Sequence, residues 1–457
     1  MNVLLIVPYN VFEAKHGNAI RVRALMDTLL KNGNRISLLM YDLPGMKNIR
    51  EVENVKVYFR PVKFRVIAIA ALMRLIFRAS TYDLLCAKME PFGGFEELVK
   101  EIIQKDEIDV IQCENVWTVP PLMSVISDGK LPIVVTAHDV LIDRFEQLYE
   151  YQGVPRLVSR RLLRSIKEIE TRALQACETC VCVSEEDRRR LIEIGADPTR
   201  ITVIPNGVDT SKIRPVGKDK KLAKELKLED EDIVLFFPGS EMFQNKRAAD
   251  DILKRILPKL DRRYKVVFAG TICSYLAKQN LPECVILAGY VEDLTSIYAL
   301  VDIVVLPITI GSGTKLKTVE AMAAGKPIIT TQNGAIGIDL DEDSNYIMIE
   351  DDLESFPCRI IELSQNEGLR NRMGREAREK ALEYDWDILM KRYVEIYEYL
   401  KNMAPSKGKA ITAERYHSKE IKFADCNIMT PVKPLSLNLL CTNDACLRII
   451  IGEAVWT

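Results

Sequence analysis

Short apolar runs alternate with helical segments along this chain in two successive series, and this alternation constrains the fold more than any other feature. β-Branched runs predict the strands of the first series, at Val3–Pro8, Arg35–Met40, Val55–Phe59, Val110–Gln112, Ile133–Ala137 and Thr179–Val183. Helical patterns lie between them, at Ala19–Lys31, Glu96–Lys105 and Leu157–Leu174. This arrangement favours a parallel sheet with helices on both faces, where ligands bind at the carboxyl ends of the strands.

A second series of the same kind follows Pro205–Asp209 and a lysine-rich stretch at 218–227. Its predicted strands are Ile233–Phe237, Lys265–Ala269, Val285–Ala288, Ile303–Leu306 and Pro327–Thr330, and helices are expected near Asn366–Glu383 and Asp387–Lys401. At 457 residues the chain is too long for one ordinary core. We therefore expect an α/β protein with two Rossmann-like, doubly wound parallel-sheet domains that face a cleft.

Composition limits the partners and the compartment. Lys and Arg number 63 against 65 Asp and Glu, so the chain has no general attraction for nucleic acid phosphates and we expect no nucleic-acid partner. Eleven cysteines without regular spacing fit reduced thiols in the cytoplasm, and Cys177, Cys180 and Cys182 are predicted core residues rather than metal ligands. The run Asn2–Val7 is too short for a signal peptide or membrane span and is predicted to be a buried strand.

The most informative segment is Pro307–Pro327, where a buried strand ends in a glycine-bearing loop and a helix follows. Gly311 and Gly313 let backbone N–H groups approach a phosphate, and the helix N-terminus adds partial positive charge. Lys317 and Glu320 are three residues apart and share one face of that helix. A diphosphate with its ribose would fit, although an ordinary strand-turn-helix unit explains the same pattern equally well.

The same segment resembles the donor-site signature of family 4 glycosyltransferases, which are retaining enzymes of the GT-B fold. Its Ala-Met-Ala-x-Gly-x-Pro part corresponds to 321–327. In the family a Glu-x7-Glu pair precedes it, and the second glutamate, which binds the ribose hydroxyls, corresponds to Glu320. Ser312 stands where the first glutamate is expected, as in a Gly-Ser-Gly-Thr-x-Leu-Lys variant of the loop.

Further stretches match the family in the same order. Ser184–Asp187 resembles its serine-acid helix start, and Pro205–Asp209 resembles its interdomain element. The family presents an arginine and a lysine to the donor diphosphate. In this chain Ser240 replaces the arginine, and Lys246 keeps the role of the lysine. His138 ends a predicted strand and resembles the family histidine that reaches into the cleft.

The first βα turn of the family carries a glycine pair, of which this chain keeps Gly17 and has His16 in place of the other. Backbone near Tyr290 and Val291 corresponds to the base-binding turn. The resemblance covers about residues 1–400 and implies catalytic roles for His138, Lys246 and Glu320. It implies donor contacts for Gly17, Asn18, Gly239, Ser240, Tyr290, Val291, Gly311, Ser312, Gly313, Thr314, Lys315 and Lys317.

The implied reaction is transfer of a hexosyl group, with retention, from a UDP- or GDP-sugar to an acceptor hydroxyl. The leaving phosphate would act as the base, and neither a metal nor a cofactor is expected. Residues 1–209 would form the acceptor domain, with a helix at about 384–402 packing back on it. Residues 210–383 would form the donor domain, while residues 403–457 match no motif.

The acceptor side contains an apolar segment, Val66–Phe77, with arginines around it, and several arginines crowd the helix that follows residue 155. Such a helix either lies in an anionic membrane interface or is partly buried with its arginines extended to water. The membrane alternative would make the acceptor lipid-linked, with the enzyme on the inner face of the cell membrane building a surface polysaccharide or glycolipid.

Two other functions fit the same architecture. A nucleotide-sugar 2-epimerase would bind the same donor, although no convincing set of carboxylates for proton abstraction is evident. A catalytically weakened binding protein is suggested by Ser240 and Ser312. A dehydrogenase is disfavoured because Val3–Asn10 is not followed by Gly-x-Gly-x-x-Gly.

Overall fold

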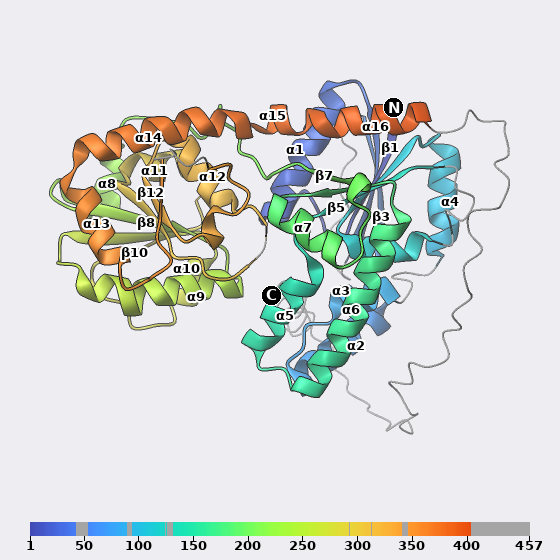
Figure 1. Cartoon of the computed structure of the whole chain (residues 1–457), viewed down its shortest axis with the longest axis horizontal. Helices are drawn as coiled ribbons and strands as arrows, with labels where there is room; N and C mark the ends of the chain where they lie inside the picture. Colours follow the sequence, from blue (N-terminus) through green and yellow to red (C-terminus); the bar gives the residue numbers. More distant parts are fainter. Residues whose placement is uncertain are drawn as a thin grey trace.

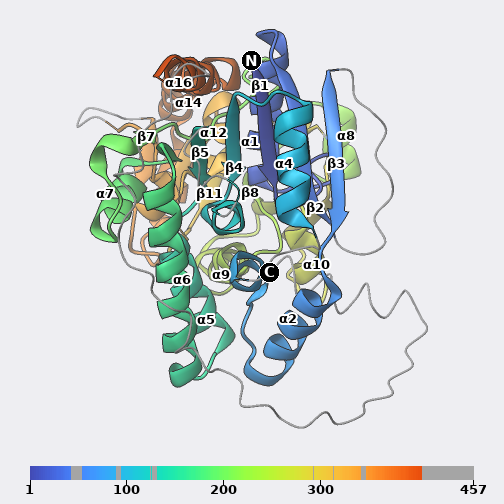
Figure 2. The same cartoon turned by 90° about the vertical axis from the view of Figure 1, so that its right-hand side faces the viewer.

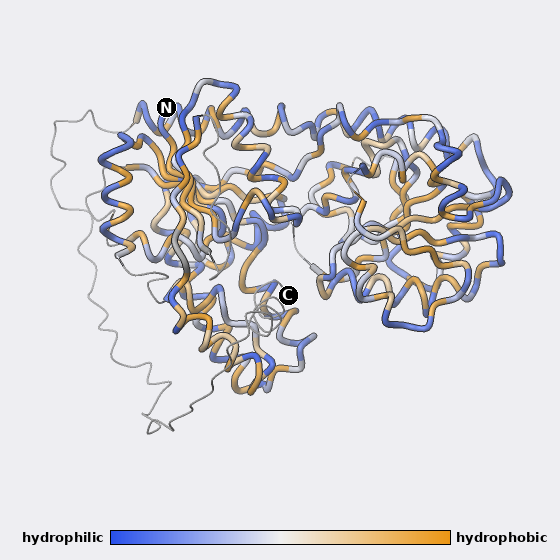
Figure 3. Tube along the Cα trace, turned by 180° about the vertical axis from the view of Figure 1, so that it is seen from behind, coloured by the Kyte–Doolittle hydropathy of each residue, from blue (hydrophilic) through white to orange (hydrophobic). Residues whose placement is uncertain are grey.

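The computed structural model describes residues 1–42, 54–88, 94–123, 125, 131–291, 293–311, 313–340 and 346–403. These residues form two lobes, each built around one parallel sheet (Figure 1). The hydrophobic parts of the chain concentrate in the two sheets (Figure 3). The fold predicted from the alternating pattern is therefore confirmed.

The first sheet has seven parallel strands in the order β3-β2-β1-β4-β5-β6-β7. They are β1 (Asn2–Val7), β2 (Arg35–Asp42), β3 (Val55–Pro61), β4 (Val110–Glu114), β5 (Ile133–Ala137), β6 (Thr179–Cys182) and β7 (Ile201–Val203). Side chains of β1 alternate between two cores: Val3 and Leu5 pack on the side of α1, and Leu4 and Ile6 pack on the opposite side. Because both faces are covered, residues 3–7 are all completely buried.

Seven helices accompany this sheet within the described residues: α1 (Gly17–Lys31), α2 (Phe64–Phe77), α3 (Tyr82–Lys88), α4 (Phe95–Lys105), α5 (Leu141–Gln152), α6 (Arg156–Ala176) and α7 (Glu185–Glu193). Short 3-10 turns lie at Val116–Thr118, Pro120–Leu122 and Pro198–Arg200. Helices α2, α5 and α6 project together below the sheet (Figure 2). The segment predicted as an apolar helix lies within α2.

The second sheet has six parallel strands in the order β10-β9-β8-β11-β12-β13. They are β8 (Ile233–Pro238), β9 (Tyr264–Ala269), β10 (Val285–Gly289), β11 (Ile303–Leu306), β12 (Ile328–Thr330) and β13 (Ile347–Ile349). Its helices are α8 (Lys220–Glu225), α9 (Phe243–Asp251), α10 (Ile272–Leu276), α11 (Leu294–Leu300), α12 (Leu316–Ala323), α13 (Phe356–Gln365) and α14 (Glu367–Ala381). A π-helical turn at Ile252–Ile256 continues α9, and 3-10 turns lie at Leu257–Lys259 and Asn333–Ala335.

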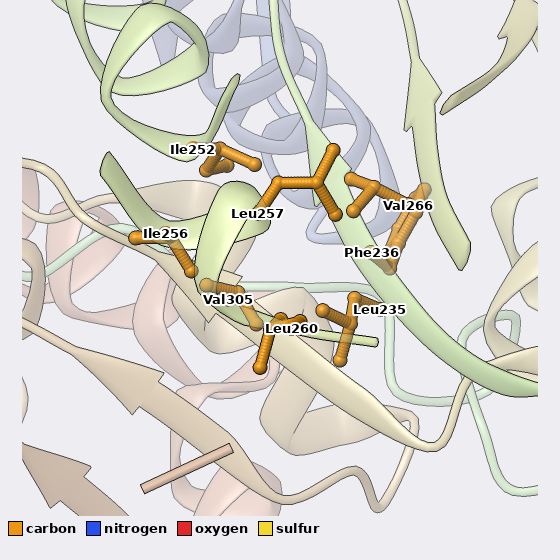
Figure 4. A pocket seen from close by; sticks show the side chains of 8 residues that line it. All are labelled: Leu235, Phe236, Ile252, Ile256, Leu257, Leu260, Val266 and Val305. Carbon is orange, nitrogen blue, oxygen red and sulfur yellow. The ribbon is translucent and has the colours of Figure 1, made fainter. Parts of the chain in front are cut away.

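Apolar side chains fill the space between this sheet and the end of α9. Figure 4 shows eight of them: Leu235, Phe236, Ile252, Ile256, Leu257, Leu260, Val266 and Val305. Every one is a hydrocarbon side chain, so the group offers no polar contact to a ligand. It forms part of the core that supports the strands.

After α14 the chain returns to the first lobe. A 3-10 turn (Leu382–Tyr384), α15 (Trp386–Leu389) and α16 (Lys391–Met403) follow one another along the top of the molecule (Figure 1). Helix α16 contacts α1 and β4, and the hydroxyl of Tyr397 donates to Gln112 Oε1 at 2.7 Å. Helix α16, the last helix among the described residues, thus packs on the first sheet.

Some local predictions differ from the structure. Strands β7 and β13 were not predicted, because each is short, lies at the edge of its sheet and is only partly buried, whereas the equally short inner strand β12 is fully buried. The helix expected over Asp387–Lys401 is divided near Met390. The sulfur-bearing side chains of Cys177, Cys180 and Cys182 are buried, as predicted. Residues 404–457, together with Ser312 and the acidic stretch 341–343, lie outside the described residues.

Candidate active site

The predicted residues gather where the strand ends of the two sheets face one another. In each sheet the strand order reverses at one point, between β1 and β4 in the first and between β8 and β11 in the second. Ligands of doubly wound sheets bind outside the carboxyl ends of the strands at such points. Loops after β1, β5, β8, β10 and β11 carry the residues selected from the sequence.

Two contacts join the lobes beside the start of α1. A Cβ added at Gly17 would lie only 2.6 Å from Leu316 Cδ1, so the absence of a side chain allows α1 and α12 to approach at their N-terminal ends. Asn18 occupies the next position of α1. The ammonium of Lys15 lies 3.7 Å from the centre of the Tyr290 ring, a cation–π contact between the lobes.

The loop after β11, which we name the donor loop (residues 307–315), is held by the first lobe. The Gly311 N–H donates to Gln147 Oε1 at 2.8 Å, and the Thr314 hydroxyl donates to the Val183 carbonyl at 2.6 Å. Gly313 has a φ of +71°, and a Cβ there would lie 2.8 Å from the His138 carbonyl oxygen. Only glycine combines this backbone conformation with so close an approach.

Two lysines at the end of this loop are withdrawn from water. Lys315 Nζ donates to the Gly313 carbonyl at 2.7 Å, and burial lowers its pKa to about 8 although Asp187 and Asp139 oppose the shift. Lys317 Nζ donates to Asn245 Oδ1 at 2.6 Å, and burial lowers its pKa to about 7. Both are ammonium groups that a bound anion would stabilise.

Glu320 lies one helical turn after Lys317, as its spacing predicted. Burial raises the pKa of the Glu320 carboxyl to about 7, while the charge of Lys317 acts in the opposite direction. Lys317 also lies 4.3 Å from the centre of the Phe237 ring. This lysine and this carboxyl therefore share a partly buried corner of the second lobe.

Lys246 is separate from these lysines in its contacts. Its Nζ pairs with Glu241 Oε1 at 3.1 Å and lies 5.1 Å from the centre of the Tyr275 ring. It lines an open crevice of about 380 Å³. The crevice is also lined by Tyr151 from the first lobe and by charged side chains of α9 and of the turn after it. Its neighbour in sequence, Asn245, is the residue that contacts Lys317.

Asn245 was not selected from the sequence. Its Oδ1 accepts from Lys317, and its Nδ2 donates to the Ser240 carbonyl at 3.0 Å and to the Ser240 hydroxyl at 3.1 Å. The only sequence feature that could have identified Asn245 as a site residue was its position next to Lys246 in the same motif. Gly239 follows β8, and a Cβ at Gly270 would lie 2.3 Å from the Gly239 carbonyl oxygen, so the loops after β8 and β9 run close together.

The turn after β10 is open to solvent. Gly289 has a φ of +70°, Tyr290 is 51% exposed, and Val291 packs against the core. The side chain of Asp293 then caps α11 by accepting from the Thr295 N–H at 3.0 Å. The turn leaves the Tyr290 ring exposed beside Lys15 of the first lobe.

His138 follows β5 in the first lobe and is almost completely buried. Its Nε2 lies 2.8 Å from Glu114 Oε2, whose side chain is equally buried. His16 caps α1, its Nδ1 accepting from the Ala19 N–H at 3.3 Å. Burial first, and His138 second, lower the pKa of His16 to about 4, so His16 is neutral near pH 7.

Glu114 was also missed in the sequence. The signal for it was polar residues spaced two apart, since such residues lie on the same face of a strand. Gln112 and Glu114 have this spacing on β4, and Thr136 on β5 has it with His138, in strands that are otherwise mainly apolar. The half-buried guanidinium of Arg144 lies 3.6 Å from Asp83 and 3.8 Å from Asp139.

Both halves of the chain match family models. Residues 17–212 match the model described as Glycosyltransferase Family 4, and residues 232–366 match the one described as Glycosyl transferases group 1. The chain belongs to the group 1 glycosyltransferases of GT-B fold. Within this GT-B chain the two matched segments coincide with the two lobes.

Relatives of this GT-B protein include the UDP-Gal:alpha-D-GlcNAc-diphosphoundecaprenol alpha-1,3-galactosyltransferase of Escherichia coli, 27% identical over 47% of this chain and 58% of that one. The D-inositol 3-phosphate glycosyltransferase of Corynebacterium jeikeium is 24% identical over 50% of this chain and 59% of that one. The aligned region thus spans little more than half the length of these relatives.

Solved structures share the whole fold. The sucrose-phosphate synthase of Thermosynechococcus elongatus aligns with a TM-score of 0.68 at 15% identity, over 88% of this chain and 99% of the other. HepE of Anabaena in complex with UDP aligns with a TM-score of 0.65 at 15% identity, over 87% and 100%. Among the described residues, no helix is both long and apolar enough to cross a membrane.

Proposed function

We propose that this protein transfers a hexosyl group from a nucleoside-diphosphate sugar, with UDP or GDP as the nucleotide, to an acceptor hydroxyl with retention of configuration. One observation supports this most strongly. The donor loop is held between the lobes and is followed by two desolvated lysines and a desolvated carboxyl, Lys315, Lys317 and Glu320. Such a group suits a diphosphate with its ribose.

The diphosphate is the part of the donor that needs most stabilisation, because negative charge develops on it as the sugar departs. In our proposal the ammonium groups of Lys315 and Lys317 receive it, and the amides of the donor loop from Gly311 to Thr314 join them once the Gly311 N–H exchanges its bond to Gln147 for a phosphate oxygen. We propose no metal and no cofactor, since these lysines supply the positive charge. Lys246, which lies on α9, is the third cation that we assign to the diphosphate.

The rest of the donor is assigned by its chemistry. Glu320 accepts hydrogen bonds from the ribose hydroxyls, and the turn at Tyr290 and Val291 meets the base. Gly17 and Asn18 at the start of α1 leave room for the sugar, while His138 contacts one of its hydroxyls. Gly239 and Ser240 shape the loop beside the diphosphate. Residues 1–209 then bind the acceptor, and residues 210–383 bind the donor.

For the reaction itself we propose front-face displacement. The bond between the anomeric carbon and the phosphate oxygen breaks, and the acceptor oxygen forms its bond on the same face of the sugar. The acceptor proton passes to the departing phosphate oxygen, so no protein nucleophile is required. Retention follows because both bonds involve one face.

For the acceptor we propose a lipid-linked sugar at the inner surface of the cell membrane. Leu75 on α2 and Leu157 on α6 are 82% and 77% exposed, and Phe64 is 66% exposed. Exposed arginines of α6, at positions 156, 160 and 161, lie beside Leu157. Apolar and basic side chains on helices that project together (Figure 2) suit an anionic lipid surface. The Escherichia coli relative is named for a diphosphoundecaprenol-linked acceptor, which supports a role in polysaccharide or glycolipid synthesis.

The decisive experiment is calorimetric titration with UDP, GDP and ADP. We expect one diphosphate to bind, and Glu320→Ala to weaken it at least about tenfold. Lys317→Met and Lys246→Met form a matched pair on two sides of α9, and we expect the larger loss for Lys317→Met. Absence of binding by any of the three nucleotides would contradict the proposed function, and a loss confined to Lys246→Met would reassign the diphosphate contact.

The two alternative functions remain distinguishable in the same preparation. A 2-epimerase would release an isomerised nucleotide sugar without an acceptor, and a binding protein would leave the donor intact. The relatives named above are glycosyltransferases, which favours neither alternative. Incubation with the bound nucleotide sugar and an acceptor, followed by product analysis, separates all three.

A further inference from the structure

A buried chain of polar side chains lies behind His138 and connects it with α16. We propose that Glu114 is a positioning residue that holds the proton of His138 on Nε2 and turns its bare Nδ1 toward a hydroxyl of the bound sugar. The kinetic part of this inference depends on the proposed function. Its structural part, the tautomer of His138, does not.

Two donors, Gln112 and Thr136, and one ring nitrogen of His138 surround the Glu114 carboxylate. Gln112 Nε2 lies 3.0 Å from Glu114 Oε1, the Thr136 hydroxyl lies 3.4 Å from the same oxygen, and His138 Nε2 lies 2.8 Å from Oε2. Glu114 is 1% exposed, so water does not compete for these oxygens. An ionised carboxylate only accepts hydrogen bonds, and this environment supplies only donors if His138 keeps its proton on Nε2.

The hydrogen bonds around Gln112 also direct donors toward the Glu114 carboxylate. The Tyr397 hydroxyl donates to Gln112 Oε1 at 2.7 Å, which orients the Gln112 amide so that its NH₂ group faces Glu114. Burial raises the pKa of the Tyr397 hydroxyl well above its usual value, so it stays a donor. The orientation of Gln112 is therefore set from α16.

The second branch of the chain runs through Tyr393. Arg21 Nη2 donates to the Tyr393 hydroxyl at 3.0 Å, and that hydroxyl lies 2.9 Å from Thr136 Oγ1. Because Arg21 has no acceptor, Tyr393 accepts from it and can direct its own proton to Thr136. Thr136 then has its hydroxyl proton available for Glu114, and the sequence of donors again ends at the carboxylate.

This arrangement leaves one nitrogen of His138 with no hydrogen-bond partner among the described residues. Nδ1 is buried and unpaired, although buried polar atoms are normally satisfied. The two ring nitrogens point in different directions, so a ring held by Glu114 at Nε2 turns Nδ1 away from it. The carbonyl of His138 adjoins Gly313 of the donor loop, and the charge of the His138 ring acts on His16 at the start of α1, so His138 lies beside the proposed donor site.

The chemical consequence is a ready hydrogen-bond acceptor. With its proton on Nε2, His138 offers the lone pair of Nδ1 to a sugar hydroxyl, and Glu114 stabilises any positive charge that the ring gains. The other tautomer would present an N–H at Nδ1 and place the Nε2 lone pair against a carboxylate. Glu114 therefore disfavours the tautomer that has its proton on Nδ1, which could not accept a hydrogen bond from the sugar at that nitrogen.

The test uses the small number of histidines. The chain has three, so ¹⁵N labelling of histidine in the full-length protein gives three pairs of ring signals, and His138→Gln identifies one pair. We expect His138 to carry its proton on Nε2 in the wild type and in Glu114→Gln, which keeps an acceptor oxygen. In Glu114→Leu we expect a mixture of tautomers. A proton on Nδ1 in the wild type, or an unchanged tautomer in Glu114→Leu, would overturn the inference.

Kinetics supply the second readout. We expect Glu114→Leu to lower kcat about 100-fold, with the donor KM changed less than about threefold, and Glu114→Gln to retain most of the activity. Equal losses in both variants, with normal thermal unfolding, would show that charge rather than tautomer matters and would also refute the inference. An inactive wild type with the Nε2 tautomer would refute the proposed function and leave the tautomer assignment standing.

Discussion

Nucleotide binding should depend on pH through Lys317. In the free protein burial lowers the pKa of this lysine to about 7, so at pH 8 and above it is mostly neutral. A bound diphosphate restores the ammonium, because opposite charge favours the charged form. The protein must then take up a proton when the nucleotide binds, and affinity falls as pH rises above 7.

The magnitude follows from the linkage. With a pKa of about 7, the charged fraction of Lys317 falls from about one in eleven at pH 8 to about one in a hundred at pH 9. This part of the affinity therefore falls about tenfold, or about 1.4 kcal/mol. Lys315, whose pKa is lowered to about 8, adds a fall of its own. Glu320 is ionised throughout this range, since its raised pKa is about 7.

The assay is calorimetric titration of the wild type and Lys317→Met with the nucleotide that binds, at pH 8 and pH 9. The terminal phosphate is fully ionised at both values, so the nucleotide contributes equally. We expect the ratio of the wild-type affinity to the Lys317→Met affinity to fall about tenfold between pH 8 and pH 9. Titration at pH 8.5 in buffers of different ionisation enthalpy should show that the wild type takes up about one proton more than Lys317→Met when the nucleotide binds. A ratio constant within threefold would refute the reasoning.

Three further predictions follow from single contacts. Gly17→Ala should lower transfer at least about tenfold by pushing Leu316 away, and Leu316→Ala in the same chain should restore most of it. Arg21→Met should lower the free energy of unfolding in urea by about 3 kcal/mol, because the carbonyls at 204 and 205 lose their buried donor. Leu75→Glu with Leu157→Glu should abolish sedimentation with vesicles that contain anionic lipid while transfer to a water-soluble acceptor is kept. Equal sedimentation of variant and wild type would remove the membrane proposal.

The sequence predicted the sheets well, because strands such as β1 and β11 are buried on both faces and are apolar throughout. It also placed Lys317 and Glu320 on one helical face, because a spacing of three has a fixed geometric meaning. Both results depend on local periodicity, which needs no knowledge of the rest of the molecule.

What the sequence could not predict depends on tertiary contacts. Asn245 and Lys246 are adjacent, and adjacent helical residues point in different directions, so a motif match could not show which one meets Lys317. Glu114 has a partner 24 residues away, and Tyr397 has one 285 residues away. No local pattern contains such pairs.

The return of α16 to the first sheet has a consequence for biosynthesis. A ribosome releases residues 1–209 long before residues 391–403, yet Gln112 and Thr136 in the first lobe bond to Tyr397 and Tyr393 in that last helix. During translation the polar side chains on β4 and β5 of the first lobe therefore stay uncovered by α16 while the second lobe is synthesised and folds. Among the described residues α16 is the last element to cover these polar groups, so a chain that ends before residue 391 leaves Gln112 and Thr136 without two of their buried partners.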